Sequence, residues 1–83
     1  MTLRKESELC GAVRRAVGDY LRLLDGEKPG AIYDMVLASM ERPLLEVILD
    51  HTQGNQTRAA EILGMNRNTL RKKLQQYGLI EGT

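Results

Sequence analysis

Apolar and polar positions along the chain recur with helical spacing, and the pattern predicts four helices and no strand. Ser7 is the predicted N-cap of the first helix, whose apolar stripe consists of Leu9, Val13, Ala16, Val17, Tyr20, Leu21 and Leu24. Glycine and proline punctuate both ends of residues 25–30, which we expect to form a connecting loop. The predicted fold class is therefore all-α.

A long second helix is predicted over residues 31–52, with Gly54 as its terminator. Its apolar residues spread around much of its surface, so we expect it to be buried on several sides. Pro43 lies inside this helix and cannot donate a hydrogen bond to the Ser39 carbonyl. Because the apolar pattern continues in phase through Met40, Leu44 and Ile48, we expect a kink within one helix. The alternative is that Pro43 begins a separate helix.

Residues 54–79 have the layout of a helix-turn-helix, whose second helix enters the major groove of DNA. Asn55 is the predicted N-cap of the first short helix, in which Ala59 and Ala60 permit close approach of the second. Gly64 has no Cβ and can end that helix in the left-handed conformation. Asn66 caps the second helix, which buries the stripe of Leu70, Leu74 and Tyr77.

The opposite face of this last helix carries the candidate contacts to nucleic acid. Asn66 and Arg67 are the candidates for base edges, because arginine can donate two hydrogen bonds to guanine and asparagine can pair with adenine. Asn68 and Gln75 lie on the same face. The candidates for phosphate contacts are Asn55, Thr57, Arg58, Thr69, Arg71, Lys72 and Lys73. Basic helix faces are also common as solvated surfaces, and some helix-turn-helix units bind only proteins.

The segments GNQTRAA, MNRNTLRKKL and QYG resemble the C-terminal end of the Fis family of bacterial nucleoid-associated factors. The similarity continues upstream through ERPLLEV and covers roughly residues 9–79. The C-terminal DNA-binding domains of nitrogen-regulator-type enhancer-binding activators are similar as well. Met1 and the absence of an ATPase segment favour a free-standing protein, and the end of a larger activator is the alternative.

The resemblance implies an intertwined homodimer in which the long helices of two subunits cross. The interface residues it suggests are Val36, Met40, Leu44, Leu45 and Ile48. Two recognition helices would then bend double-stranded DNA at degenerate sites with an A/T-rich centre, with salt-dependent affinity. The resemblance also suggests RNA polymerase as a partner.

Three departures from the family's pattern limit what the resemblance implies. Only eight residues precede Leu9, so we do not expect the stimulation of DNA invertases that a longer N-terminal arm performs. Gln75 and Gln76 stand where the family has lysines, which removes cationic phosphate contacts. Asn68 stands where glycine is common.

Charge and length fit this interpretation. The net charge is only +1, but residues 1–53 hold seven basic against nine acidic residues, and residues 54–83 hold five against two. The positive charge thus lies on the predicted DNA-binding part. The 83 residues allow one domain, with residues 1–53 for dimerisation and residues 54–83 for DNA, and a second subunit would complete its small aliphatic core.

Other function classes have little support in the sequence. No catalytic arrangement is visible, and one Cys10 and one His51 do not make a zinc site, so we expect no enzyme, cofactor or metal. Glu41, Glu46 and Asp50 are interpreted as the solvated face of the long helix. No membrane span or signal peptide is visible, and the single cysteine fits a reducing cytoplasm, where we expect the protein on the nucleoid. The alternative to a DNA-bending regulator is an adaptor that holds protein partners.

Overall fold

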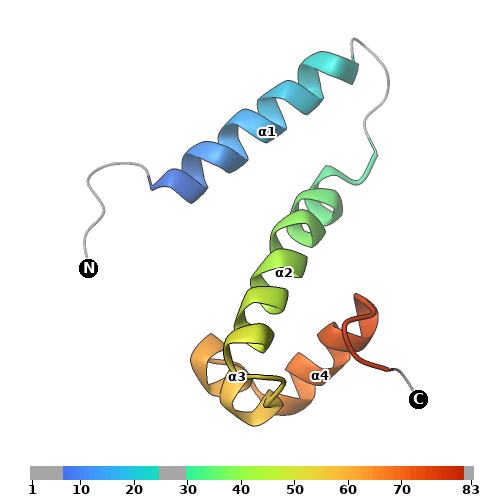
Figure 1. Cartoon of the computed structure of the whole chain (residues 1–83). Coiled ribbons are helices and arrows are strands. Elements are labelled where there is room, and N and C mark those ends of the chain that lie inside the picture. Colours follow the sequence, from blue (N-terminus) through green and yellow to red (C-terminus); the bar gives the residue numbers. More distant parts are fainter. Residues whose placement is uncertain (1–6, 25–29, 82–83) are drawn as a thin grey trace. The chain divides into compact units, whose positions relative to one another are not determined.

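A computed structural model describes residues 7–24 and 30–81 of the chain (Figure 1). Within these ranges the chain forms four α-helices and no strand, as the periodicity predicts. They are α1 (Glu8–Leu24), α2 (Ile32–His51), α3 (Gln56–Leu63) and α4 (Arg67–Gln76). The loop predicted over residues 25–30 lies outside the described residues except for Gly30. The chain divides into two compact units, Met1–Leu37 and Ala38–Thr83.

The first helix is capped as predicted, and no residue of its apolar stripe is fully buried. The side-chain oxygen of Ser7 accepts a hydrogen bond of 3.1 Å from the backbone N–H of Cys10, which satisfies one of the free N–H groups of the first turn. α1 buries none of its described residues, and Leu9 is 62% exposed. An amphipathic helix of this kind needs another apolar surface to cover its stripe.

The long helix α2 runs without interruption through Pro43, which confirms one helix and not two. It is one residue shorter at each end than the range 31–52 predicted from the sequence. Gln53 and Gly54 follow it with positive φ values of 55° and 84°, and the N–H of Gly54 donates to the Leu49 carbonyl over 2.9 Å. This closing bond satisfies a carbonyl of the last turn and confirms Gly54 as the terminator.

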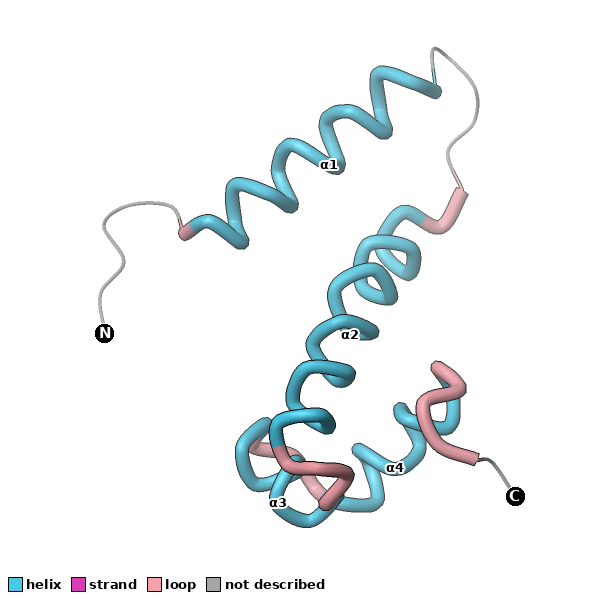
Figure 2. The backbone as a smooth tube through the Cα atoms, viewed as in Figure 1, coloured by secondary structure: helices cyan, strands magenta, loops and turns pink. Residues whose placement is uncertain are grey.

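Short loops join α2 to α3 and α3 to α4, as Figure 2 shows. Gly64 adopts the predicted left-handed conformation, with φ of 74°, and its N–H donates to carbonyls of the last turn of α3. Met65 donates a further hydrogen bond of 3.0 Å to the Ala60 carbonyl. A side chain at position 64 would strain this turn, because L-residues rarely adopt that φ.

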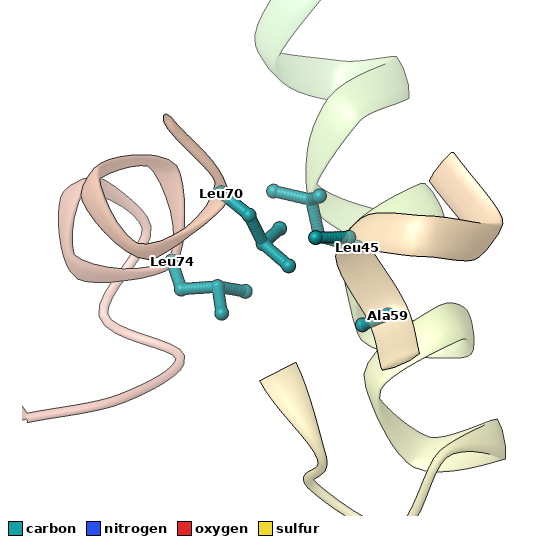
Figure 3. Close-up of a cluster of buried hydrophobic side chains, with 5 residues drawn as sticks. Leu45, Ala59, Leu70 and Leu74 are labelled. Atoms are coloured by element: carbon teal, nitrogen blue, oxygen red, sulfur yellow. The ribbon is translucent and has the colours of Figure 1, made fainter. Parts of the chain in front are cut away.

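The core of the described residues lies where α2, α3 and α4 meet (Figure 3). Leu70 and Leu74 project from α4 toward Leu45 of α2, and Ala59 and Ala60 of α3 complete the cluster. Each of the three leucines is at most 1% exposed, and burial of such a side chain contributes roughly 1.5–3 kcal/mol. The partly buried residues packed against this cluster are Ile48, Leu49, Leu63, Met65, Tyr77, Leu79 and Ile80. The core therefore fixes α4 on its leucine stripe and turns its other face outward.

Candidate nucleic-acid interface

The first element of the candidate interface is the beginning of α3. Oδ1 of Asn55 accepts a hydrogen bond of 3.1 Å from the backbone N–H of Arg58, which confirms the predicted cap. Thr57 and Arg58 are exposed in the first turn that this cap organises. A hydroxyl and a guanidinium at a helix N-terminus suit an anionic ligand such as phosphate.

Asn66 caps the N-terminus of α4 as Asn55 caps that of α3. Its Oδ1 accepts a hydrogen bond of 2.7 Å from the backbone N–H of Asn68, and its own backbone is extended, with φ of −67° and ψ of 140°. A bidentate pair with adenine would use the same Oδ1 as acceptor. The cap therefore competes with the base contact predicted for Asn66, while the amide N–H donors of that side chain do not take part in the cap.

Four cationic side chains lie exposed on α3 and α4: Arg58, Arg67, Arg71 and Lys72. We call these four residues the cationic face. At about 100° per residue, Lys72 lies on the side of α4 opposite the buried Leu70 and Leu74, whereas Arg67 and Arg71 flank that buried stripe. The polar residues Asn68 and Thr69 are exposed beside them. Within α4, which is described in full, the first turn holds no acidic residue. The geometry thus presents several hydrogen-bond donors and positive charges to one partner.

Lys73 is placed differently from the other predicted phosphate contacts. Its Nζ lies 2.8 Å from Oε2 of Glu41 on α2, and the two side chains are only 29% and 16% exposed. The interpretation of Glu41 as part of a solvated face is wrong, because α4 covers it, whereas Glu46 and Asp50 are exposed as expected. Sequence spacing within α2 carries no signal for this contact, since the partner lies on another helix.

Hydrogen bonds and charges around Glu41 shift two pKa values. The hydrogen bond from Lys73, followed by that from Tyr77, lowers the pKa of the Glu41 carboxyl. The hydrogen bond to Glu41, followed by desolvation, raises the pKa of the Tyr77 phenol. Glu41 is consequently ionised and Tyr77 neutral at neutral pH, so the phenol can donate its 2.6 Å hydrogen bond to a charged acceptor.

Among the residues suggested for the dimer interface, Leu45 has the surroundings least like those of an interface residue. It is 1% exposed and packed within its own chain, so no surface of it is left for a second subunit. Ile48 also packs against the core, and Val36 is partly buried. Met40 and Leu44 are exposed, at 37% and 50%.

Six large apolar residues of α2 are exposed, and all except Met35 follow a spacing of alternately four and three positions. The five residues of this series are Tyr33, Leu37, Met40, Leu44 and Val47, and we call them the α2 seam. At about 100° per residue they fall within an arc of about 80°, which is the pattern of helices that pair along their length. The interface residues suggested by the family resemblance include Met40 and Leu44 of this series but not Tyr33, Leu37 and Val47, although the alternating spacing is visible in the sequence.

A shallow hollow of about 330 Å³ is lined by Glu46, Leu49, Asp50, Gln53, Gly54 and Leu79, and its two carboxylates do not suit a polyanion. In residues 7–24 and 30–81 no group of three or more metal-ligating side chains comes together. No helix in the described part of the chain is long and apolar enough to span a bilayer.

Comparison with known proteins connects this geometry to a family. Residues 36–77 match the family described as "Bacterial regulatory protein, Fis family", a segment that contains the core, both caps and the cationic face. Over 67 residues the chain is 55% identical to the DNA-binding protein Fis of Glaesserella parasuis serovar 5 (strain SH0165). That alignment covers 81% of this chain and 68% of the relative.

Proposed function

The chain belongs to the Fis family of bacterial regulatory proteins, and from that premise we propose that it is a homodimer that binds and bends double-stranded DNA. In this role it acts on the nucleoid, in the cytoplasm, as a transcriptional regulator and not as an enzyme. The observation that carries the proposal is the cationic face, which the buried Leu70 and Leu74 turn outward from the core.

The residues of the cationic face divide by the contact each is placed to make. Arg67, at the start of α4, is the candidate for guanine, since residues at the beginning of a recognition helix reach base edges. Arg58, Arg71 and Lys72 are the candidates for phosphates, with Asn55, Thr57 and Thr69 as neutral donors. Asn66 holds the cap of α4, and its amide N–H groups are donors for a base or a phosphate.

A second copy of the chain supplies the apolar surface that one copy leaves exposed. The α2 seam and the apolar stripe of α1, which is not fully buried in one copy, are the two surfaces we assign to dimerisation. Two recognition helices related by a twofold axis contact two half-sites, and the free energies of both contacts add to the affinity.

The preference for particular DNA follows from the family resemblance. Bending the duplex toward two closely spaced recognition helices compresses the central minor groove, which favours A/T-rich centres through their shape. Regulation of transcription adds RNA polymerase as a proposed partner. Membership of the family is also compatible with a position at the end of a larger activator.

A gel-shift assay on short duplexes that differ only in their central base pairs tests this function. We expect binding at micromolar protein or below, stronger binding to A/T-rich than to G/C-rich centres, and a bend detectable by the distance between fluorophores at the two ends. The absence of binding to any duplex at low salt would reject the DNA-binding proposal and favour the protein adaptor. Equal affinity for all centres without a bend would reject recognition by deformation.

A further inference from the structure

Glu41 of α2 accepts hydrogen bonds from two α4 side chains that lie one helical turn apart. Its Oε2 is 2.8 Å from Nζ of Lys73, and its Oε1 accepts a hydrogen bond of 2.6 Å from the hydroxyl of Tyr77. Both carboxylate oxygens thus have a partner on the same helix. Because the side chains of Glu41 and Lys73 are partly shielded from water, their attraction is less screened than that of a surface pair.

Arg42, the next residue of α2, holds the end of the same helix. One Nη atom donates a hydrogen bond of 2.5 Å to the backbone carbonyl of Tyr77, the C-cap residue of α4. The guanidinium carbon lies 5.8 Å from the centroid of the Tyr77 ring, within the range of a cation–π contact. A cation at a helix C-terminus also interacts favourably with the helix dipole. Two consecutive residues of α2 therefore clamp the C-terminal half of α4.

The contacts of Glu41 and Arg42 distinguish two kinds of basic residue on α4. Arg67, Arg71 and Lys72 are exposed and belong to the cationic face. The positive charge of Lys73 is already compensated by the carboxylate of Glu41. A phosphate contact by Lys73 would require breaking this ion pair and leaving the Glu41 charge partly buried beside the helix, which is costly.

We propose that Glu41 is a positioning residue that fixes α4 against α2 and withholds Lys73 from the DNA backbone; this rests on the proposed function. Glu41 follows Met40 of the α2 seam directly, so the same stretch of α2 that faces the second subunit also holds the recognition helix. The direction of α4 relative to the dimer axis is then set by a polar contact in addition to the leucine core. The number of cations that face DNA is correspondingly smaller by one in each subunit.

Salt titration of DNA binding measures the number of cations that contact phosphates. Each phosphate contact contributes about 0.9 to the steepness with which log K falls with log salt concentration. Glu41→Gln keeps an oxygen for the Tyr77 hydroxyl and removes the charge that holds Lys73. We expect its slope to steepen by about 0.9 for each subunit on the duplex, with stronger binding to non-specific DNA. The ratio of affinity for a preferred centre to that for random DNA should fall, because α4 is held less firmly.

Two further variants separate release of Lys73 from a general change in charge. Glu46→Gln removes one negative charge from the same helix, where Glu46 pairs with Arg42 at 3.5 Å, and should leave the slope unchanged. Lys73→Gln should also leave the slope unchanged, and combining it with Glu41→Gln should restore the wild-type slope. Should Glu41→Gln fail to fold, Lys73→Gln still tests the proposal.

A decrease of about 0.9 per subunit in the slope of Lys73→Gln would overturn the proposal, because Lys73 would then contact a phosphate. An unchanged slope in a folded Glu41→Gln variant would overturn it as well. Wild-type protein without any salt-dependent affinity for DNA would instead reject the proposed function itself.

Discussion

The phenol of Tyr77 donates a hydrogen bond of 2.6 Å to Oε1 of Glu41 and joins the end of α4 to the middle of α2, although the two residues are 36 positions apart. Lys73 contacts the other oxygen of the same carboxylate. The ion pair with Lys73 needs Glu41 in its ionised form, and the hydrogen bond from Tyr77 is stronger to a carboxylate than to a neutral acceptor. The packing of α4 against α2 consequently depends in part on the charge of this carboxylate, in addition to the leucine core.

This dependence predicts a loss of stability in acid. The pKa of Glu41 is lowered in the folded protein, chiefly by the Lys73 hydrogen bond, so its contribution is fully present above about pH 4.3, the value in an unfolded chain. It is lost as the pH falls through the lower folded value. Urea unfolding should therefore show Glu41→Gln less stable than wild type at pH 7 and the difference shrinking below about pH 4.

Glu46→Gln is the matched control for this experiment, because Glu46 lies in an exposed pair on the same helix. Its unfolding should stay close to that of the wild type across the same pH range, since exposed pairs contribute about 0–1 kcal/mol. A Glu41→Gln variant that tracks the wild type at every pH would contradict a stabilising role for the Glu41 contacts.

Leu44 and Leu45 are neighbours on α2 with different predicted roles, since Leu44 is 50% exposed and Leu45 is 1% exposed. Leu45→Ala leaves a cavity beside Leu70 and Leu74 and should lower the free energy of unfolding by about 2–5 kcal/mol. Leu44→Ala should mainly raise the dimer dissociation constant, measured by sedimentation equilibrium, because it shortens a residue of the α2 seam. Self-association that is weakened by Leu45→Ala and untouched by Leu44→Ala would place the interface elsewhere.

Asn66 offers a test of capping against base recognition. Removing the cap oxygen in Asn66→Ala should cost about 1 kcal/mol of stability, whereas Asn66→Ser keeps a cap acceptor and should retain most of it. If the cap is the main role of Asn66, the serine variant should also bind DNA nearly as well as wild type. A serine variant with normal stability and a loss of affinity near 1–3 kcal/mol would show that Asn66 reads a base instead.

Local features of the fold could be predicted from the sequence because each rests on residues close together in the chain. Asn55 and Asn66 cap helices by bonding N–H groups two or three positions ahead, and Gly64 ends α3 within one turn. The small Ala59 and Ala60 indicate a close helix contact without reference to its partner. Continuity of α2 through Pro43 followed from the phase of its apolar pattern.

The parts that could not be predicted depend on which residues of distant helices meet. Leu45 has the hydrophobicity of a dimer residue, and only the position of α4 shows that its side chain is used inside the chain. Lys73 looks like its neighbours Arg71 and Lys72 in sequence, but only Lys73 faces Glu41. Helical periodicity gives the angle of a residue on its own helix and does not identify the residue opposite.

The cationic face is tested most directly by titrating a fluorescent duplex with wild-type protein and with the Arg67→Ala/Arg71→Ala variant at several salt concentrations. We expect the logarithm of the wild-type binding constant to fall linearly with the logarithm of salt concentration. The variant should lose affinity, by roughly 5- to 150-fold if Arg67 makes a good bidentate base contact, and show a shallower slope. Arg22→Ala, which removes a charge from α1 where Arg22 pairs with Asp19, should bind as the wild type does. Equal affinity and slope for wild type and the double variant at every salt concentration would contradict the account.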